Sequence, residues 1–327
     1  MSVVKNNSDF LFLFDATLCN PNGDPDQENK PRMDYDTKTN LVTDIRLKRS
    51  IRDYLKNEGV EIFVDMEGEN KVSPETKLQY VIEKTLNNEE DVDQIFQENP
   101  AMKVAFKELI KAKKEKDSIF KALQLDKKNQ ELNIYILAQL VKNKFVDIRM
   151  FGSAFAVAGF SKAYTGAIQL NWGYSLHEVE LVDSNSIVTI MNDDSSTFGK
   201  DYRLHYSLVA FNGTINKHAA QTTGLTEADR NTFRTSVWNA VSANPTRSKL
   251  NQYAKLHLEI VYNDNYSNGN FGDLRKYITV TPKKENIRGL EDLEIDFSKL
   301  KQLISDNTGN GKAIKEVYLK NHPAINY

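Results

Sequence analysis

The chain has 327 residues, of which 40% are hydrophobic and 27% charged, enough for one large domain or two ordinary ones. This composition excludes a wholly disordered chain and a collagen-like one. Lys and Arg number 43 against 45 Asp and Glu, so the net charge of −2 excludes a uniformly basic nucleic-acid coat but not a local basic face. No stretch approaches 18 apolar residues, no secretion signal is visible, and the single Cys19 cannot form an internal disulfide. We therefore expect a cytoplasmic protein without a membrane partner.

The first third of the chain predicts a strand, a loop and a helix. Residues 9–18 are aromatic and apolar on both faces, as in a central strand, and a polar loop follows to about residue 40. A helix is predicted over 44–57, with Thr43 as its N-cap and Gly59 at its C-terminal end. A second strand is expected over 60–64.

Residues 73–144 lack strand alternation and predict a helical insertion. Its acidic stretch, 89–98, precedes a lysine-rich stretch, 103–128. We expect these two stretches to meet head to tail between neighbouring copies of the chain.

The remaining elements complete an α+β pattern. They are strands over 147–158, 164–180 and 202–211, a helix over 226–242 with Asp229 in a capping box, strands over 254–262 and 277–281, a helix over 298–305, and a glycine turn at 309–312 before a C-terminal strand. The order is compatible with a ferredoxin-like, or RNA-recognition-motif-like, core that carries large insertions.

Sequence templates for catalysis and metal binding do not match. The run 309–312 resembles a phosphate-binding loop, but Asp306 stands where the first glycine belongs and Ala313 replaces Ser or Thr. The five histidines show no paired metal-ligand spacing, and Cys19 has no neighbouring histidine. We therefore predict no catalytic residue, no metal and no cofactor.

A cationic face is the strongest functional signal in the residues themselves. Arg46, Lys48, Arg49 and Arg52 lie opposite the apolar stripe of the 44–57 helix. The preceding loop offers amides and unshielded backbone at Asn20, Asn22 and Gly23, and a second polar and basic loop contains Arg247 and Lys249. Such groups neutralise or contact phosphates without reading sequence.

Several motifs, in order, resemble those of one family. They are CNPNGDPD (19–26), PRMD (31–34), VTDIRLKRSIRDY (42–54), DIRMFGS (147–153), YTGAIQLNWGYS (164–175), TGLTEAD (223–229) and TRSK (246–249). Together they resemble the Cascade backbone subunits of type I CRISPR systems, which belong to the Cas7 superfamily. The match looks closest to the Csh2/Csd2 branch, and so to type I-B.

The resemblance implies a single hand-shaped subunit. Its palm, RNA-recognition-motif-like, would comprise 9–65, 147–180 and 202–283, its helical fingers about 73–144, and its β-hairpin thumb about 186–202. Copies would oligomerise along one CRISPR RNA and present it for pairing with target DNA in antiviral defence. Large, small and guide-end-capping Cascade subunits would be the other partners.

The RNA-binding residues follow from the cationic face and the resemblance together. They are Asn20, Asn22, Gly23, Arg32, Thr43, Arg46, Lys48, Arg49, Arg52, Arg149, Phe151, Gly152, Gly166, Gln169, Met191, Phe198, Arg247 and Lys249. Phe151 would stack on a base, Gly152 and Gly166 would allow close approach of the guide, and Met191 and Phe198 would be apolar wedges on the thumb.

Two alternatives remain open. A metal-dependent endoribonuclease of the same superfamily would use the loop acids Asp24 or Asp34, which we interpret as loop-shaping residues. A purely structural filament protein without RNA would leave the basic helix unexplained.

Overall fold

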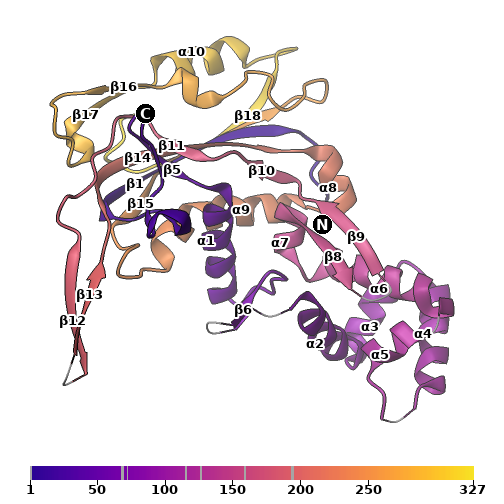
Figure 1. The fold of residues 1–327 in the computed structure, drawn as a ribbon. Coiled ribbons are helices and arrows are strands. Elements are labelled where there is room, and N and C mark those ends of the chain that lie inside the picture. Colours follow the sequence, from indigo (N-terminus) through magenta and orange to yellow (C-terminus); the bar gives the residue numbers. More distant parts are fainter. Residues whose placement is uncertain are drawn as a thin grey trace. The chain divides into compact units, whose positions relative to one another are not determined.

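The computed structural model describes residues 2–67, 70–71, 73–114, 116–125, 127–157, 160–192 and 195–327, which form two compact units (Figure 1). The sheet unit comprises Lys5–Tyr54, Ile168–Lys217 and Arg230–Tyr327. The helical unit comprises Met1–Val4, Leu55–Ala167 and His218–Asp229. The expectation of a mixed α and β fold is confirmed.

The sheet unit is built on eight described strands whose neighbours all pair antiparallel. Their order is β18 (Ile314–Asn321), β15 (Gln252–Tyr262), β1 (Ser8–Cys19), β14 (Leu204–Ile215), β11 (Gly173–Ser175), β5 (Thr39–Val42) and β4 (Met33–Asp34), and β10 (Ile168–Leu170) also pairs with β14. β1 lies inside the sheet because both its faces are apolar, and residues 8–16 are all buried. The strands predicted over 9–18, 202–211 and 254–262 are therefore confirmed.

Helices cover the two faces of this sheet. Phe10 of β1 packs against Phe233 of α9 (Glu227–Ala243), with ring centroids 5.2 Å apart. On the opposite face, Leu11 and Leu13 share a buried apolar cluster with Leu300 of α10 (Ser298–Asn307). The alternation of Phe10, Leu11, Phe12 and Leu13 along the strand thus supplies both cores.

Shorter elements complete the sheet unit. They are β2 (Gly23–Asp24), η1 (Pro25–Gln27), β3 (Lys30–Pro31), β12 (Ser186–Asn192), β13 (Ser195–Lys200), η3 (Leu274–Tyr277), β16 (Thr279–Pro282), η4 (Leu290–Asp292) and β17 (Leu293–Asp296). β12 and β13 form an antiparallel hairpin within the expected thumb. Residues 193–194 and the side chains of Met191 and Phe198 lie outside what the structure describes.

The helical unit contains the expected helical segment. Its helices are α2 (Pro74–Leu86), α3 (Glu89–Phe96), α4 (Pro100–Ala112), α5 (Ile119–Leu125), η2 (Lys127–Asn129), α6 (Gln130–Asn143) and α7 (Val146–Phe151). Two hairpins, β6 (Met66–Glu67) with β7 (Asn70–Lys71) and β8 (Gly152–Val157) with β9 (Phe160–Thr165), complete it, and α8 (Lys217–Thr223) leads into α9. One apolar cluster joins these helices around Ile82, Phe96, Ile136 and Leu140.

Charge pairs inside the helical unit involve two acids of the acidic stretch. Asp93 of the acidic stretch lies 2.6 Å from the Nζ of Lys103, and Asp91 lies 2.7 Å from the Nζ of Lys144. These acids therefore have partners within their own chain, because α3 packs beside α4 and α6.

Four predicted strands differ from the structure. Residues 60–64 form no strand, because the backbone N–H groups of Phe63 and Val64 donate to the carboxylate of Asp147, at 2.8 and 3.1 Å. The strand expected over 147–158 begins as the helix α7 and turns at Gly152, where φ is +77°; residue 158 lies outside the described residues. The strand expected over 277–281 begins with the last residue of η3 instead, and β16 runs only from Thr279 to Pro282.

The strand expected over 164–180 is three strands, β9, β10 and β11. Two glycines mark the breaks. At Gly173, a Cβ atom would lie 2.6 Å from the ring of Phe211, and at Gly166 it would lie 2.1 Å from the backbone carbon of Phe151. Both positions therefore need a residue without a side chain.

Candidate nucleic-acid interface

The N-terminus of α1 (Asp44–Asn57) organises the candidate site in the sheet unit. Thr43 caps the helix as predicted, since its Oγ1 accepts the N–H of Arg46 at 3.2 Å. The Oδ1 of Asn22 accepts from both the N–H and the hydroxyl of Thr43, at 2.8 and 2.9 Å. The loop predicted to offer amides is therefore attached to the start of the helix.

The loop that contains Lys249 lies against the same place. The N–H of Asn20 donates to the carbonyl of Ser248 at 2.8 Å, and the Nζ of Lys249 donates to the carbonyl of Asn20. Asn20 is buried, and its own Oδ1 lacks a hydrogen-bond partner. Three segments far apart in sequence, predicted separately to bind RNA, thus meet at one site.

Arg46 and Lys249 form an unusual pair of cations at this site. Burial, followed by the positive charge of Arg46, lowers the pKa of Lys249 to about 8. Burial also lowers the pKa of Arg46, against the opposing charge of Asp53. Within the described part of the chain, neither side chain has a carboxylate within ion-pair distance. Two desolvated cations near each other and without an acid are what an anion site requires.

The other basic residues of α1 are partly neutralised. Lys48 lies 2.9 Å from Asp44, and Arg49 pairs with Asp53, each one turn along the helix. Arg52 is half-buried on the same helix. The positive charge of the predicted face is therefore concentrated at Arg46, where the helix meets Lys249.

Two further predicted arginines lie beside this region and have acidic partners. Arg32 lies 3.4 Å from Asp24, and its backbone N–H donates to the carbonyl of Asn22. Arg247 lies 3.2 Å from Asp201, which also binds Arg203. Arg203 donates to the carbonyls of Leu18 and Arg247, at 2.8 and 3.1 Å, a bridging role that no sequence motif indicates.

Gly23 and Gln169 complete the predicted residues in the sheet unit. A Cβ atom at Gly23 would lie 2.9 Å from the backbone carbonyl oxygen of Asn29, so glycine favours the close approach of these two parts of the loop. Gln169 lies on β10 with its side chain exposed.

The predicted residues in the helical unit have internal roles. The guanidinium of Arg149 binds both oxygens of Asp229, at 2.9 and 2.7 Å, and donates to the carbonyls of Val141 and Lys142. Arg149 is only 9% exposed. The N–H groups of this guanidinium thus donate to acceptors inside the fold, and we do not retain Arg149 as an RNA contact.

Phe151 and its two neighbouring glycines are likewise part of the packing. Phe151 is 7% exposed, which leaves little of its ring for a base. A Cβ at Gly152 would lie 2.2 Å from the carbonyl oxygen of Tyr164, and one at Gly166 would lie 2.4 Å from the nitrogen of Gly152. The close approach that these glycines allow in this structure is between segments of this chain.

The loop acids proposed for metal-dependent cleavage shape their own turns. Asp24 accepts the N–H of Asp26 at 3.2 Å, and Asp34 accepts the N–H groups of Asp36 and Thr37 at 3.1 and 3.4 Å. Hydrogen bonds from Thr37 lower the pKa of Asp34. Among the described residues, no group of three or more His, Cys, Asp or Glu side chains is arranged to hold a metal ion.

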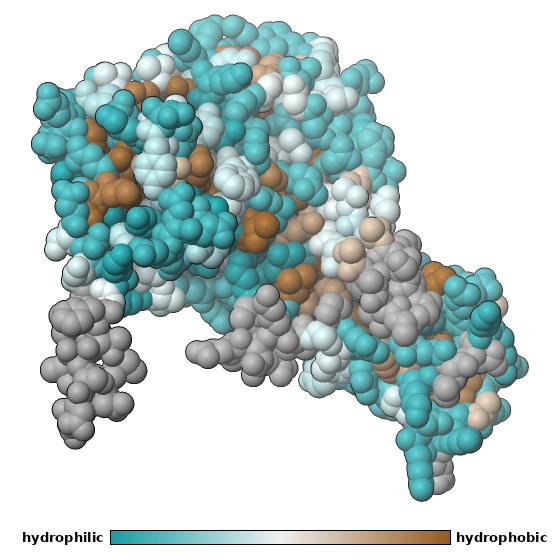
Figure 2. Space-filling model, in the orientation of Figure 1, coloured by the Kyte–Doolittle hydropathy of each residue, from teal (hydrophilic) through white to brown (hydrophobic). Residues whose placement is uncertain are grey.

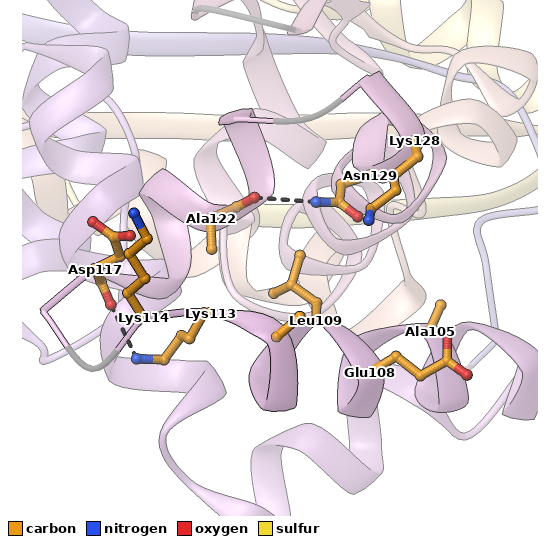
Figure 3. Close-up of a pocket in the computed structure, with 10 residues that line it drawn as sticks. Ala105, Glu108, Leu109, Lys113, Lys114, Asp117, Ala122, Lys128 and Asn129 are labelled. Carbon is orange, nitrogen blue, oxygen red and sulfur yellow. Dashed lines mark hydrogen bonds between the residues drawn. The ribbon is translucent and has the colours of Figure 1, made fainter.

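A pocket of about 610 Å³ lies among the helices α4, α5 and η2 of the helical unit (Figure 3). Its floor includes Leu109 and Ala122, and the Nζ of Lys113 donates to the carbonyl of Asp117 at 3.0 Å. None of the residues predicted to bind RNA lines this pocket.

The visible surface is largely hydrophilic, with apolar side chains in small groups (Figure 2). None of the described helices has both the length and the apolar character to cross a membrane.

The fold and the site define a mixed α and β protein with a broad antiparallel sheet and a cationic site at the start of one helix. Residues 6–298 match the family model described as CRISPR-associated protein Cas7. The match covers most of the chain, which therefore belongs to the Cas7 family, as the motif resemblance predicted.

The chain is also similar to individual proteins. The chain is 28% identical over 319 residues to the CRISPR-associated protein Cas7 of Haloferax volcanii, covering 90% of this chain and 82% of that protein. It is also similar to a chain of a "CRISPR RNA-guided surveillance complex, pre-nicking", with a TM-score of 0.45, 15% identity and 80% of each chain covered. A chain of a second "CRISPR RNA-guided surveillance complex" gives a TM-score of 0.38 and 12% identity, covering 80% of this chain and 78% of that one.

Proposed function

We propose that this protein is a backbone subunit of a CRISPR RNA-guided surveillance complex and binds the guide RNA at the Arg46–Lys249 pair. Family membership supports the class of complex, and the pair of desolvated cations supports the site. Burying like charges near each other costs free energy that a bound phosphate would recover. Sequence-independent phosphate contacts also suit a subunit that must accept any guide.

The helix adds to this anion site. The positive end of its dipole lies at the N-cap Thr43, which is bound by the loop residue Asn22. Arg46 lies one turn from the N-cap, on the same helix end. Guide phosphates would therefore meet two full charges and the helix dipole together.

The finer assignments form part of this proposal. The sheet order β15–β1–β14–β11, with α1 after β1 and α9 after β14, supports an RNA-recognition-motif-like palm. The segment 73–144 would be the fingers and the β12–β13 hairpin the thumb, with Met191 and Phe198 as wedges. The complex would be of type I-B and would act in the cytoplasm, pairing its guide with target DNA alongside other Cascade subunits.

Removing the two cations tests the proposed site. The protein carrying Arg46→Ala and Lys249→Met should bind single-stranded RNA at least about tenfold more weakly, equally for all sequences. The slope of log affinity against log salt should fall by about 0.7 for each lost phosphate contact. Fluorescence anisotropy over a salt series measures both quantities.

The control is Lys299→Met, which removes one charge from an exposed position on α10. It should leave affinity and salt slope unchanged. Lys249→Met should change the melting temperature of RNA-free protein little, because removing a partly buried charge beside Arg46 offsets the loss of the hydrogen bond to the carbonyl of Asn20. RNA affinity unchanged in the folded double variant would contradict the site, and cleavage of the RNA with added divalent metal would favour the endoribonuclease.

A further inference from the structure

Trp172 is a large aromatic side chain that is exposed to solvent in a short turn. It lies in the short connection between β10 and β11, and 44% of its surface is accessible. Its neighbours in the chain are Asn171 and Gly173, so it belongs to no apolar segment. Burying an indole stabilises a fold by several kcal/mol, and an exposed one often marks a binding surface.

The backbone of Trp172 is held from several directions. Its N–H donates to the Oδ1 of Asn171 at 2.8 Å, and its carbonyl accepts from the Nη1 of Arg275 at 2.8 Å. Arg275 is 5% exposed, and its guanidinium stacks on Tyr174, 4.1 Å from the ring centre. Its Nε and Nη2 both donate to the carboxylate of Asp273. The indole is therefore exposed on a rigid support, which lowers the entropic cost of binding a ligand.

Arg32 adds a cation to the indole. Its guanidinium carbon lies 6.0 Å from the ring centre of Trp172, within cation–π range, and its Nε is buried without a hydrogen-bond partner. Aromatic rings together with arginine guanidinium groups form the usual stacking surfaces for bases of single-stranded nucleic acids.

Hydrogen bonds connect this surface to the phosphate site. Asn22 accepts the N–H of Arg32 through its carbonyl and caps Thr43 through its side chain. Gly173, next to Trp172, pairs with Val42, next to Thr43. The indole thus lies at the same helix end as Arg46, where a strand with phosphates on the cations would have its bases within reach.

We propose that Trp172, with Arg32 beside it, is a stacking platform for a nucleobase of single-stranded RNA. The proposal rests on the proposed function, because the phosphate site brings the RNA there. Stacking uses the π-face that every base has, so the platform would hold the guide without selecting its sequence.

Intrinsic fluorescence tests the platform directly, because the chain has only two tryptophans. The second, Trp238, lies on α9 with the Nζ of Lys320 4.6 Å from its ring. Trp238→Phe keeps an aromatic ring for this lysine and leaves Trp172 as the only fluorescent indole. This protein, washed free of nucleic acid at high salt, is titrated with a twelve-nucleotide oligouridylate and with an abasic ribose-phosphate oligomer of equal length.

Oligouridylate should quench Trp172 on binding, whereas the abasic oligomer should bind more weakly and leave the emission intensity unchanged. Trp172→Ala should weaken oligouridylate binding about tenfold and hardly affect the abasic oligomer, and Trp172→Phe should retain most of the affinity. Melting temperatures of the variants show whether they are folded.

The two proposals fail in different ways. Normal RNA affinity with unchanged Trp172 emission, or equal affinity for both oligomers, would overturn the platform and leave the phosphate site standing. Failure of the parent protein to bind either oligomer would overturn the proposed function and the platform with it.

Discussion

Gly152 and Gly166 lie backbone against backbone in the helical unit, so close that neither position can hold a Cβ atom. A Cβ on Gly166 would be 2.4 Å from the nitrogen of Gly152, and one on Gly152 would be 2.5 Å from the nitrogen of Gly166. Gly152 also has a φ of +77°, which L side chains rarely adopt. This contact lets α7 end and the β8–β9 hairpin begin within one residue.

We expect Gly166→Ala to destabilise the protein by at least about 2 kcal/mol, because the added methyl group collides with backbone that cannot rotate away. Gly59→Ala is the control for a substitution without a collision. Gly59 has a φ of +77°, which Gly166 does not share, and an added Cβ there has open space around it, so only about 1 kcal/mol of backbone strain is expected. Urea unfolding of both variants measures the difference. A Gly166→Ala protein with parental stability but no RNA affinity would instead restore the guide as the neighbour of this glycine.

The sequence predicts elements whose signal is local. The apolar run of β1, the N-cap Thr43 of α1 and the capping box of α9 each depend on residues within one element, and all three are present. Residues 60–64 form no strand because their backbone N–H groups donate to a distant side chain, and the segment 147–158 begins as a helix that turns at Gly152. Asp147 accepts the N–H of Phe63 across 84 positions, and no local pattern reveals such a pair.

The candidate site shows the same division. The basic face of α1 is visible in the sequence. The sequence does not show that Asp44 and Asp53 form ion pairs with two of its cations, or that Lys249 from a remote loop lies near a third. Arg149 has the same side chain as Arg46, yet it lies beside an acid, Asp229, that is 80 positions away. Trp172 is an aromatic residue in a polar turn. This pattern is only a weak indication of a binding residue, and Trp172 is not among the RNA-binding residues predicted from the sequence.

Arg149→Met should destabilise the protein by about 3–5 kcal/mol, because it leaves the buried carboxylate of Asp229 without its cation. Asp229 also caps α9 through Thr226, so Thr226→Ala is the control for the cap alone and should cost about 1 kcal/mol. Thermal and urea unfolding measure both variants. RNA affinity of folded Arg149→Met protein should equal that of the parent. A stable variant with weaker RNA binding would return Arg149 to the interface.

RNA affinity should depend on pH through Lys249. In the free protein its pKa is lowered from 10.5 to about 8, and a bound phosphate would raise it by favouring the charged amine. RNA binding then takes up a proton as the pH rises above 8, so affinity is greatest below pH 8 and decreases above it, by at most tenfold per pH unit. An oligoadenylate, whose bases do not ionise in this range, is titrated at several pH values from 7 to 9.

Lys249→Arg separates this effect from general changes with pH, because arginine stays charged throughout the range. Its affinity should be flat where that of the parent decreases. RNA-free parent protein should show the opposite trend in stability. Its unfolded chain binds the proton more tightly than the folded one between pH 8 and 10.5, so the free energy of unfolding rises with pH there. Parallel affinity curves for parent and variant would exclude Lys249 as the titrating contact.

Assembly along the guide should depend on RNA instead of on charge pairs between subunits. Two acids of the acidic stretch are paired within the chain, Asp93 with Lys103 and Asp91 with Lys144. A subunit with net charge −2 has little general attraction for RNA or for its own copies, so we expect the proposed Arg46–Lys249 site to supply the contact. We therefore expect RNA-free protein to be monomeric or polydisperse.

Adding guide RNA should give particles whose mass rises in steps of one subunit as the RNA is lengthened, because each copy covers a fixed number of nucleotides. Mass photometry with three RNA lengths measures the steps, and a higher salt concentration should dissociate the particles into RNA and protein. The Arg46→Ala, Lys249→Met protein should not form them, whereas Asp93→Asn should assemble like the parent, since its partner Lys103 belongs to the same chain. A single stoichiometry at all three lengths would exclude a backbone role and indicate a discrete RNA-binding protein, and loss of assembly in Asp93→Asn would show that the acidic stretch acts between copies after all.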